Sequence, residues 1–497
     1  MLSHGDRKAF RTNSLLFYII VICGLGLFAG ILTIWISPIL ILGGLAAAFL
    51  IIATIMRPEI GLLGLLVATS SIVFDQQLPV LSIGGISLHI PDLLLLGSLG
   101  LIAIRWMVNP EFKIIHTPLD WPLLIFYGTT LLSTFIALFQ SSLEIEPARR
   151  AIRVLSYYLA FFVVTNLVRK RSQLNFLLKG LFFLATIVAA AMVVQYFLGT
   201  SIPLLPGRVE TLNTENLMYE GVTRIIPPGW SILMVSAVAI FCIIIQEKSR
   251  RLAYPRILQF CFLAIAIVFT FIRAYWAALI FVLFLSGFIF TGYQRQKFFW
   301  WSLVVILLSG VLLFYGFREP KSQVGKLVEA TYSRLDTLLN PKTVNEASLQ
   351  WRYVENEYAL RSILSHPLLG LGFGALYRPY DKRIDYAGMG WDARGYIHNG
   401  HLWIFLDSGL FGYLAFIWLS LAFLYRGFRF WRSPGSNWLK GVVLGFTLAY
   451  LAALIASLAV PTFTVQNWTP VIGIMMGINE VILIRFRQAE PGVEPIV

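Results

Sequence analysis

The sequence predicts an all-α integral membrane protein with about 12 to 14 membrane-spanning helices and one large helical loop outside the cytoplasm. Of its 497 residues, 58% are hydrophobic and only 13% are charged, whereas soluble domains carry roughly 25% charged residues. The mean hydropathy of +0.76 agrees with a membrane protein. The apolar residues also lie in long blocks, most of them long enough for a helix to cross the hydrocarbon layer. The many Phe, Trp and Tyr residues exclude intrinsic disorder.

Each long apolar block is a candidate membrane span. The expected spans are 15–36, 38–56, 60–74, 91–108, 121–139, 149–168, 174–198, 230–246, 257–272, 275–292, 298–317, 401–424, 438–460 and 468–485. The blocks at 60–74 and 257–272 are shorter than the roughly 20 residues that a spanning helix needs, so we expect them to be tilted or partial spans.

The basic residues predict the orientation of the chain. Arg7, Lys8 and Arg11 precede the first apolar block, which has no small-residue cleavage site, so this block is expected to be an uncleaved span. Connections rich in Lys and Arg alternate along the chain with connections that carry few, and the basic ones face the cytoplasm in membrane proteins. Both termini are therefore predicted to be cytoplasmic. The net charge of +14 then reflects topology and not nucleic-acid binding.

These spans divide the chain into three predicted parts. Residues 1–317 form an N-terminal transmembrane bundle of about eleven spans, with an outer loop at 199–229 that is rich in Pro and Gly. Residues 318–397 form the large extracytoplasmic loop. Residues 398–497 form a C-terminal transmembrane bundle with a short cytoplasmic tail.

The extracytoplasmic loop is expected to contain two helices, over 322–339 and 345–365. The second helix carries an apolar stripe at helical spacing, formed by Leu349, Tyr353, Leu360 and Leu364. Such a stripe is typical of a helix that lies on the membrane face. Pro367 ends this helix. No strand precedes the glycines of 369–374, so they indicate a tight turn and not a dinucleotide site.

Three arginines open the span at 149–168 from the outside. Arg149, Arg150 and Arg153 stand where neither the positive-inside rule nor the helix dipole favours a cation. An anionic partner must offset this cost. Two interpretations remain open: ion pairs with Glu144 or Glu146, and contacts to the phosphates of a substrate.

Further arginines lie at the outer boundary. Arg273 occupies a very short turn between two apolar blocks, beside Tyr275 and Trp276. It either reaches lipid headgroups next to these aromatic residues or holds a diphosphate with its planar guanidinium. Arg352 on the predicted surface helix is either solvated or part of a site, and Arg224 lies in the outer loop.

Two histidines close the extracytoplasmic loop. His398 and His401 flank Asn399 and Gly400, and Asp407 follows. They are either structural or functional, and their spacing offers no third metal ligand, so we expect no metal. Neutral imidazole accepts a proton from a hydroxyl near neutral pH. Together with arginines that stabilise a departing diphosphate, such a base suits group transfer to a hydroxyl without a cofactor.

Three stretches resemble the O-antigen ligase/polymerase superfamily. Residues 398–412 resemble its signature, with a His-Asn pair, an apolar helix, an acidic residue and a Gly-apolar-apolar-Gly run. Residues 351–372 resemble the preceding segment, with an Arg, an amphipathic helix and His-Pro-Leu-x-Gly-x-Gly. Arg273 resembles the family's Arg at the outer end of a mid-chain span. The specific resemblance extends over about 270–415.

The resemblance implies a GT-C-like glycosyltransferase in the bacterial inner (plasma) membrane. Such an enzyme transfers a glycan from an undecaprenyl-diphosphate donor to a hydroxyl of an acceptor lipid or glycan, with inversion and without a metal. His398 would be the base, and Arg273 and Arg352 would hold the diphosphate. Further substrate contacts are expected from Arg149, Arg150, Arg153, Arg224, Asn399, His401 and Asp407. The motifs leave open whether the protein is a ligase or a polymerase.

A small-anion transporter, bicarbonate-like and of the same superfamily, is the alternative. Transporters carry ionisable groups or broken helices near the middle of the bilayer. In this sequence the polar candidates gather at the outer rim, and only Asp407 and Glu480 fall inside predicted spans. The sequence therefore favours the enzyme.

Overall fold

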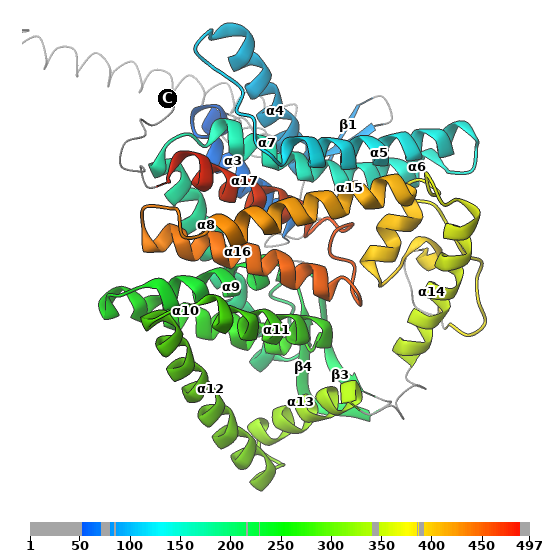
Figure 1. Cartoon of the computed structure of the whole chain (residues 1–497). Coiled ribbons are helices and arrows are strands. Elements are labelled where there is room, and N and C mark those ends of the chain that lie inside the picture. Colours follow the sequence, from blue (N-terminus) through cyan, green and yellow to red (C-terminus); the bar gives the residue numbers. More distant parts are fainter. Residues whose placement is uncertain are drawn as a thin grey trace, which may run out of the picture.

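The computed structural model describes residues 52–70, 80–83, 86–214, 217–227, 229–339, 347–384, 386 and 392–487. Over these ranges the chain forms a helical bundle with two short β-hairpins (Figure 1). Among the described helices, six are long and apolar enough to cross a membrane and four apolar helices are shorter. The all-α membrane class is confirmed. The span expected at 15–36 and most of that at 38–56 lie outside the described residues, so the total number of spans remains a prediction.

Eleven of the expected spans coincide with helices of the bundle. These are α3 (Pro58–Thr69), α4 (Ile90–Val108), α5 (Asp120–Phe139), α8 (Arg171–Leu198), α9 (Trp230–Gln246), α10 (Arg250–Phe269), α11 (Arg273–Ile289), α12 (Tyr293–Arg318), α15 (Gly400–Phe430), α16 (Asn437–Ala456) and α17 (Thr469–Arg485). The positions agree because uninterrupted apolar sequence favours a helix that satisfies its own backbone within the membrane.

The span expected at 149–168 is not one helix. It consists of α6 (Ile145–Ser156), a 3-10 turn (Tyr157–Leu159) and α7 (Ala160–Leu167). The arginines lie on α6, where Ile145 is exposed and Ala148 is buried. This helix is amphipathic and the apolar α7 follows it, which corrects the prediction of a single continuous span.

The centre of the bundle is the pair of α9 and α16, which pack against each other and are almost entirely buried. Gly441 and Gly445 of α16 face the backbone of Ile243 and Ala239 in α9, with no room for a Cβ. Small residues allow such close approach of helices in membranes. By contrast, only 6% of the most apolar stretch of α12 is buried inside the bundle. Most of its apolar surface therefore faces outward, as expected for contact with lipid.

The glycine turn at 369–374 is confirmed and is seated on α5 and α15. Gly370 and Gly372 have positive φ angles of 72° and 82°, which glycine adopts without strain. The hydroxyl of Ser133 in α5 donates to the carbonyls of Leu369 and Asp407. At this point α15 is broken by Gly409, which has φ 64° and ψ −167°.

The remaining elements cover one end of the bundle, which holds the first residues of α11 and α15. We call this the outer end, following the predicted orientation. It carries α13 (Gln323–Leu339), α14 (Ala347–Ser365) and η4 (Ala393–Gly395). Both α13 and α14 agree with the helices expected in the extracytoplasmic loop, and Tyr353, Leu360 and Leu364 of the apolar stripe are exposed.

The outer loop at 199–229 contains a β-hairpin that the sequence did not predict. Strand β3 (Arg208–Thr214) pairs antiparallel with β4 (Leu217–Ile226), and the hairpin lies beside α13 (Figure 1). A second hairpin, β1 (Val80–Ile83) and β2 (Ile86–His89), precedes α4.

Candidate active site

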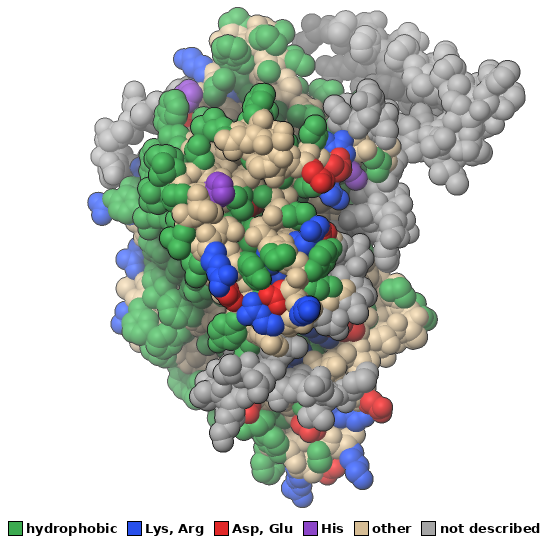
Figure 2. Space-filling model, turned by 90° about the vertical axis from the view of Figure 1, so that its right-hand side faces the viewer, with side chains coloured by type: hydrophobic (Ala, Val, Ile, Leu, Met, Phe, Trp, Pro, Cys, Tyr) green, Lys and Arg blue, Asp and Glu red, His purple; other side chains and the backbone are tan. Residues whose placement is uncertain are grey.

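The outer end of the bundle carries a mixed group of charged side chains. Figure 2 looks onto this end and shows Lys, Arg, Asp and Glu side chains gathered near its middle, beside hydrophobic surface. Such a concentration of charge at the boundary of a membrane bundle is costly unless each charge has a partner or a function. The partners of the predicted site residues show which charges are offset.

His398 is held by the buried carboxylate of Glu355 on α14. One oxygen, Oε2, lies 2.9 Å from Nδ1 of His398 and 2.8 Å from its backbone nitrogen. A carboxylate only accepts hydrogen bonds, so the imidazole donates from Nδ1 and keeps the lone pair of Nε2. The His398 side chain is 26% exposed, whereas that of Glu355 is fully buried. In its neutral form the imidazole then presents Nε2 as a proton acceptor.

The other oxygen of Glu355 faces a buried arginine. Nη2 of Arg378 lies 3.6 Å from Oε1 and also donates to the carbonyl of Ala393. The guanidinium lies about 6 Å from the ring centres of Trp351 and Tyr386, within cation–π range. The buried carboxylate that holds His398 thus has a buried cation beside its other oxygen.

Aromatic rings enclose the imidazole on two sides. The ring centroids of Tyr396 and Trp351 lie 4.9 Å and 6.2 Å from that of His398. Burial raises the pKa of Tyr396, the Glu355 carboxylate raises it further, and the Arg352 guanidinium lowers it. Arg352 therefore lies within electrostatic reach of Tyr396, whose ring contacts that of His398.

Arg273 is presented by a strained turn between α10 and α11. Phe271 has φ 51°, a left-handed conformation that is rare for a bulky residue. Arg224 of the hairpin lies against this turn: it donates to the carbonyl of Thr270 at 3.2 Å and to Glu210 at 3.2 Å. Burial lowers the pKa of Arg224, the Glu210 carboxylate raises it, and Arg273 is among the cations that lower it. Arg224 and Arg273 are thus neighbours.

The aromatic residues beside Arg273 lie inside the bundle. Tyr275 is 3% exposed and Trp276 is 8% exposed, and Tyr275 contacts the rings of Trp230 and Trp468. They do not form an interfacial belt at the lipid surface, so this geometry disfavours the interpretation of Arg273 as a headgroup anchor.

The three arginines of α6 differ among themselves. Arg149 pairs with Glu146 at 2.8 Å, and Arg150 lies 4.0 Å from the same residue. These ion pairs match one of the two interpretations open for this group. Arg153 is half-buried, and its Nε has no hydrogen-bond partner within the described ranges.

Three predicted substrate contacts have structural roles at the start of α15. Asn399 caps the helix, since its side-chain oxygen accepts from the backbone nitrogens of His401 and Leu402. Nε2 of His401 lies 3.0 Å from the carbonyl of Leu454 in α16. Asp407 is 2% exposed and accepts from the indole of Trp403 and the backbone of Gly374. These contacts position the helix and the glycine turn, and a role of Asn399, His401 and Asp407 in substrate binding remains a prediction.

Comparison with known proteins identifies the region that holds this cluster. Residues 258–417 match the family model described as O-antigen ligase. The region that holds the His398 cluster is therefore similar to O-antigen ligases. No curated protein matches the chain. The match supports a membrane glycosyltransferase of the O-antigen ligase/polymerase type and gives no support to the transporter alternative.

The O-antigen ligase region contains Arg273, Arg352, Glu355, Arg378 and His398. The α6 arginines and Arg224 lie before it. The match therefore covers the whole His398 cluster, while the cations outside it come from the rest of this chain. Among the described residues, no group of three His, Cys, Asp or Glu side chains is arranged to hold a metal.

Sequence reasoning missed Glu355 and Arg378. Glu355 lies 43 residues before His398, so only the fold reveals their contact. One sequence signal could have identified Glu355. It is three residues after Arg352 and four before Ala359, so it lies on the same helix face as these two residues, opposite the exposed stripe of α14. An acidic residue on the inward face of a surface helix is a candidate partner for a buried base or cation.

Proposed function

We propose that the protein transfers a glycan from an undecaprenyl-diphosphate-linked donor to an acceptor hydroxyl, at the outer face of the bacterial inner membrane. The observation that carries the proposal is the contact between Glu355 and Nδ1 of His398, which sets the imidazole as a proton acceptor. The acceptor is a lipid in a ligase and another glycan in a polymerase, and the site chemistry is the same for both.

The proposed reaction is an inverting displacement. Nε2 of His398 takes the proton of the acceptor hydroxyl while that oxygen bonds to the anomeric carbon of the donor sugar. The bond from this carbon to the diphosphate oxygen breaks, and the diphosphate leaves with the electron pair. Attack from the face opposite the leaving group inverts the anomeric centre. The Glu355 carboxylate stabilises the imidazolium that forms, as the acidic residue of a catalytic triad does.

Arginines are assigned to the leaving group. The departing diphosphate gains negative charge, and guanidinium groups stabilise phosphate oxygens through paired hydrogen bonds. We assign this role to Arg273 and Arg352, with Arg224 and Arg153 as further contacts to the donor. These cations replace the metal ion that other enzymes use to neutralise a diphosphate, so the transfer needs no added metal.

Reconstitution tests this proposal. The purified full chain is supplied with an undecaprenyl-diphosphate glycan and candidate acceptors in the presence of a chelator, and transfer is measured. We expect transfer with the chelator present and a loss of at least about 100-fold in the His398→Ala variant. The control is His366→Ala, because His366 is an exposed histidine of the same outer segment. Equal rates in the two variants would overturn the assignment of His398 as the base.

A further inference from the structure

A polar cavity lies at the end of the bundle opposite to the candidate active site. It has a volume of about 270 Å³ and is formed where α9 ends, α12 begins and α15 connects to α16. Because α11 runs from Arg273 to Ile289, about 25 Å of helix separates the two ends. In the predicted orientation this is the cytoplasmic end, so the cavity is separate from the transfer site.

The walls of this cavity are cationic. Lys248, Arg432 and Lys440 line it, and no acidic residue is among its described lining residues. The nearest carboxylate along the chain, Glu247, pairs with Arg256 at 2.9 Å. Within the described ranges neither lysine has an acidic partner, so the cavity carries unneutralised positive charge.

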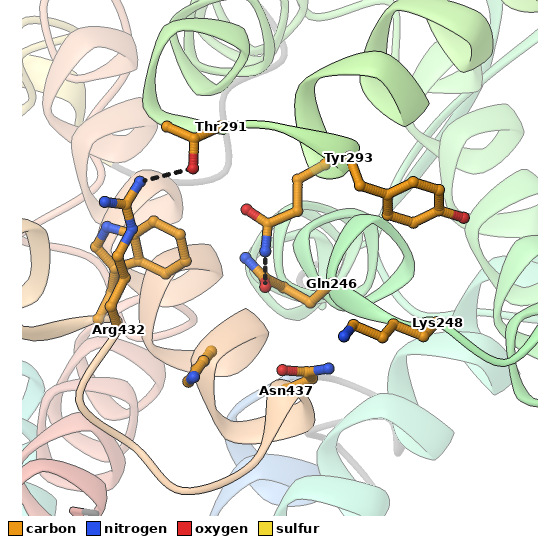
Figure 3. Close-up of a pocket in the computed structure, with 9 residues that line it drawn as sticks. Gln246, Lys248, Thr291, Tyr293, Arg432 and Asn437 are labelled. Atoms are coloured by element: carbon orange, nitrogen blue, oxygen red, sulfur yellow. Dashed lines mark hydrogen bonds between the residues drawn. The ribbon is translucent and has the colours of Figure 1, made fainter.

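A buried amide completes the cavity. Gln246 is 3% exposed, yet its Nε2 has no hydrogen-bond partner in the described part of the chain, while its oxygen accepts from Gln294 at 2.6 Å. Figure 3 shows Gln246 between Arg432 on one side and Lys248 on the other. A buried donor left unpaired costs free energy. An acceptor in the cavity would remove this cost, which points to a bound anion.

The surroundings of the cavity indicate a lipid. Tyr293 and Trp431 line it, and such aromatic residues are typical of the headgroup level. The helix that begins at Tyr293 exposes Phe299 and Trp300 a turn or two further on, 60% and 69% exposed. Basic pockets between membrane helices on the cytoplasmic side bind anionic headgroups. The volume is also below the roughly 300–1,000 Å³ of pockets for drug-sized ligands, which suits one headgroup.

The geometry points to a binding site for the phosphate of an anionic phospholipid, built from Gln246, Lys248, Arg432 and Lys440. This site is independent of glycan transfer. Arg432 is fixed for the role, because its Nη2 already donates to the carbonyl of Ile289 and contacts Thr291, and its guanidinium lies 4.7 Å from the ring centre of Trp431. Its remaining donors stay available to a phosphate.

Native mass spectrometry of the full chain in detergent tests this site. Phosphatidylglycerol and phosphatidylcholine are titrated onto the protein, and the bound fraction is measured. We expect one tightly bound phosphatidylglycerol, with an affinity about 30-fold lower in the Arg432→Ala/Lys440→Ala double variant. The matched control is Arg251→Ala/Arg429→Ala, which removes the same charge from exposed residues of the same end outside the cavity.

Four results would overturn the proposal. Equal retention of the two lipids would show that the phosphate group is not recognised. An equal loss of affinity in the double variant and its control would show that only the general charge of this end matters. Displacement of the lipid by millimolar inorganic phosphate would assign the cavity to free phosphate. The Gln246→Leu variant, which keeps every charge, is expected to weaken phosphatidylglycerol binding as well, and an unchanged affinity would count against the site.

Discussion

The Glu355 carboxylate is fully buried, and burial of a charge is costly unless partners offset it. Its two oxygens meet His398 and Arg378, so the three residues form one electrostatic unit. In this unit Glu355 does not touch the substrate. It fixes the tautomer and the orientation of the imidazole, which makes it a positioning residue for the proposed base.

The Glu355→Gln variant is expected to keep the shape of the site and to lose the charge that stabilises an imidazolium. We expect kcat to fall on the order of 100-fold while KM for the donor changes little. Steady-state kinetics of the reconstituted enzyme measures both values. Glu357→Gln is the control, because Glu357 is on the same helix, is partly exposed and pairs with Arg361. A wild-type kcat in Glu355→Gln would contradict the positioning role.

The Arg273→Lys variant tests the diphosphate assignment. Lysine keeps the charge but lacks the planar fork of donors that matches phosphate oxygens. We expect kcat/KM for the donor to fall about 10-fold or more, because hydrogen bonds between charged groups are worth roughly 1.5–3 kcal/mol. Arg208→Lys, on an exposed part of the hairpin, is expected to have no effect. Full activity of Arg273→Lys would favour contact with lipid headgroups instead.

The sequence predicted the chemical groups of the site better than their connections. His398 and Arg273 stand at the ends of apolar blocks, where an ionisable residue is costly without a partner or a function, and Arg352 lies on the helix predicted over 345–365. Glu355 and Arg378 were missed because their partners are distant in the sequence. Their contacts join α14, the 377–380 stretch and the residues just before α15, and only the fold places these three segments side by side. Asn399 and Asp407 were predicted to contact the substrate, and the structure shows that they also cap a helix and stabilise a turn.

At the scale of elements, the apolar blocks predicted the positions of the helices well, but they did not predict where a helix is interrupted. The block at 121–139 became α5 at Asp120–Phe139. The apolar block at 149–168 contains a 3-10 turn that separates α6 from α7, and the length of the block does not predict this interruption of the helix. The β3–β4 hairpin was missed because its sequence is mixed and polar, so its stability depends on pairing and on contact with α13.

The Gly409→Ala variant tests the break in α15. The backbone of Gly409 has φ 64°, and a Cβ there would meet the carbonyl of Leu368 in the glycine turn. We expect a loss of about 2 kcal/mol in stability, seen as a lower melting temperature in detergent, together with reduced transfer. Gly310→Ala on α12 is the control, because a Cβ there meets nothing within 4 Å. Equal melting temperatures would show that the break carries no strain.

The whole molecule has a different chemistry at each end. The outer end holds the His398 cluster, and the opposite end holds the cationic cavity. The predicted orientation, with both termini in the cytoplasm, determines which leaflet each end meets. Positive charge alone does not distinguish the two sites, because arginines occur at both. The partners do: carboxylates and aromatic rings surround the outer arginines, whereas the cavity at the other end has no acidic lining residue.

Cysteine labelling tests this orientation. In a chain from which Cys23, Cys242 and Cys261 have been replaced, we expect Lys382→Cys to react with a membrane-impermeant maleimide applied to spheroplasts. Arg251→Cys is expected to react only after the membrane is permeabilised. Both positions are exposed in the structure. The reverse pattern would show that the chain is inserted the other way and would place the proposed transfer site in the cytoplasm.

The most direct test of the central claim is a structure of the full chain with a bound undecaprenyl-diphosphate glycan. The account predicts that the diphosphate lies within hydrogen-bond reach of Arg273 and Arg352, and that the anomeric carbon faces Nε2 of His398 across the space for an acceptor hydroxyl. A diphosphate bound away from these residues, such as between Arg432 and Lys440 at the opposite end, would contradict it.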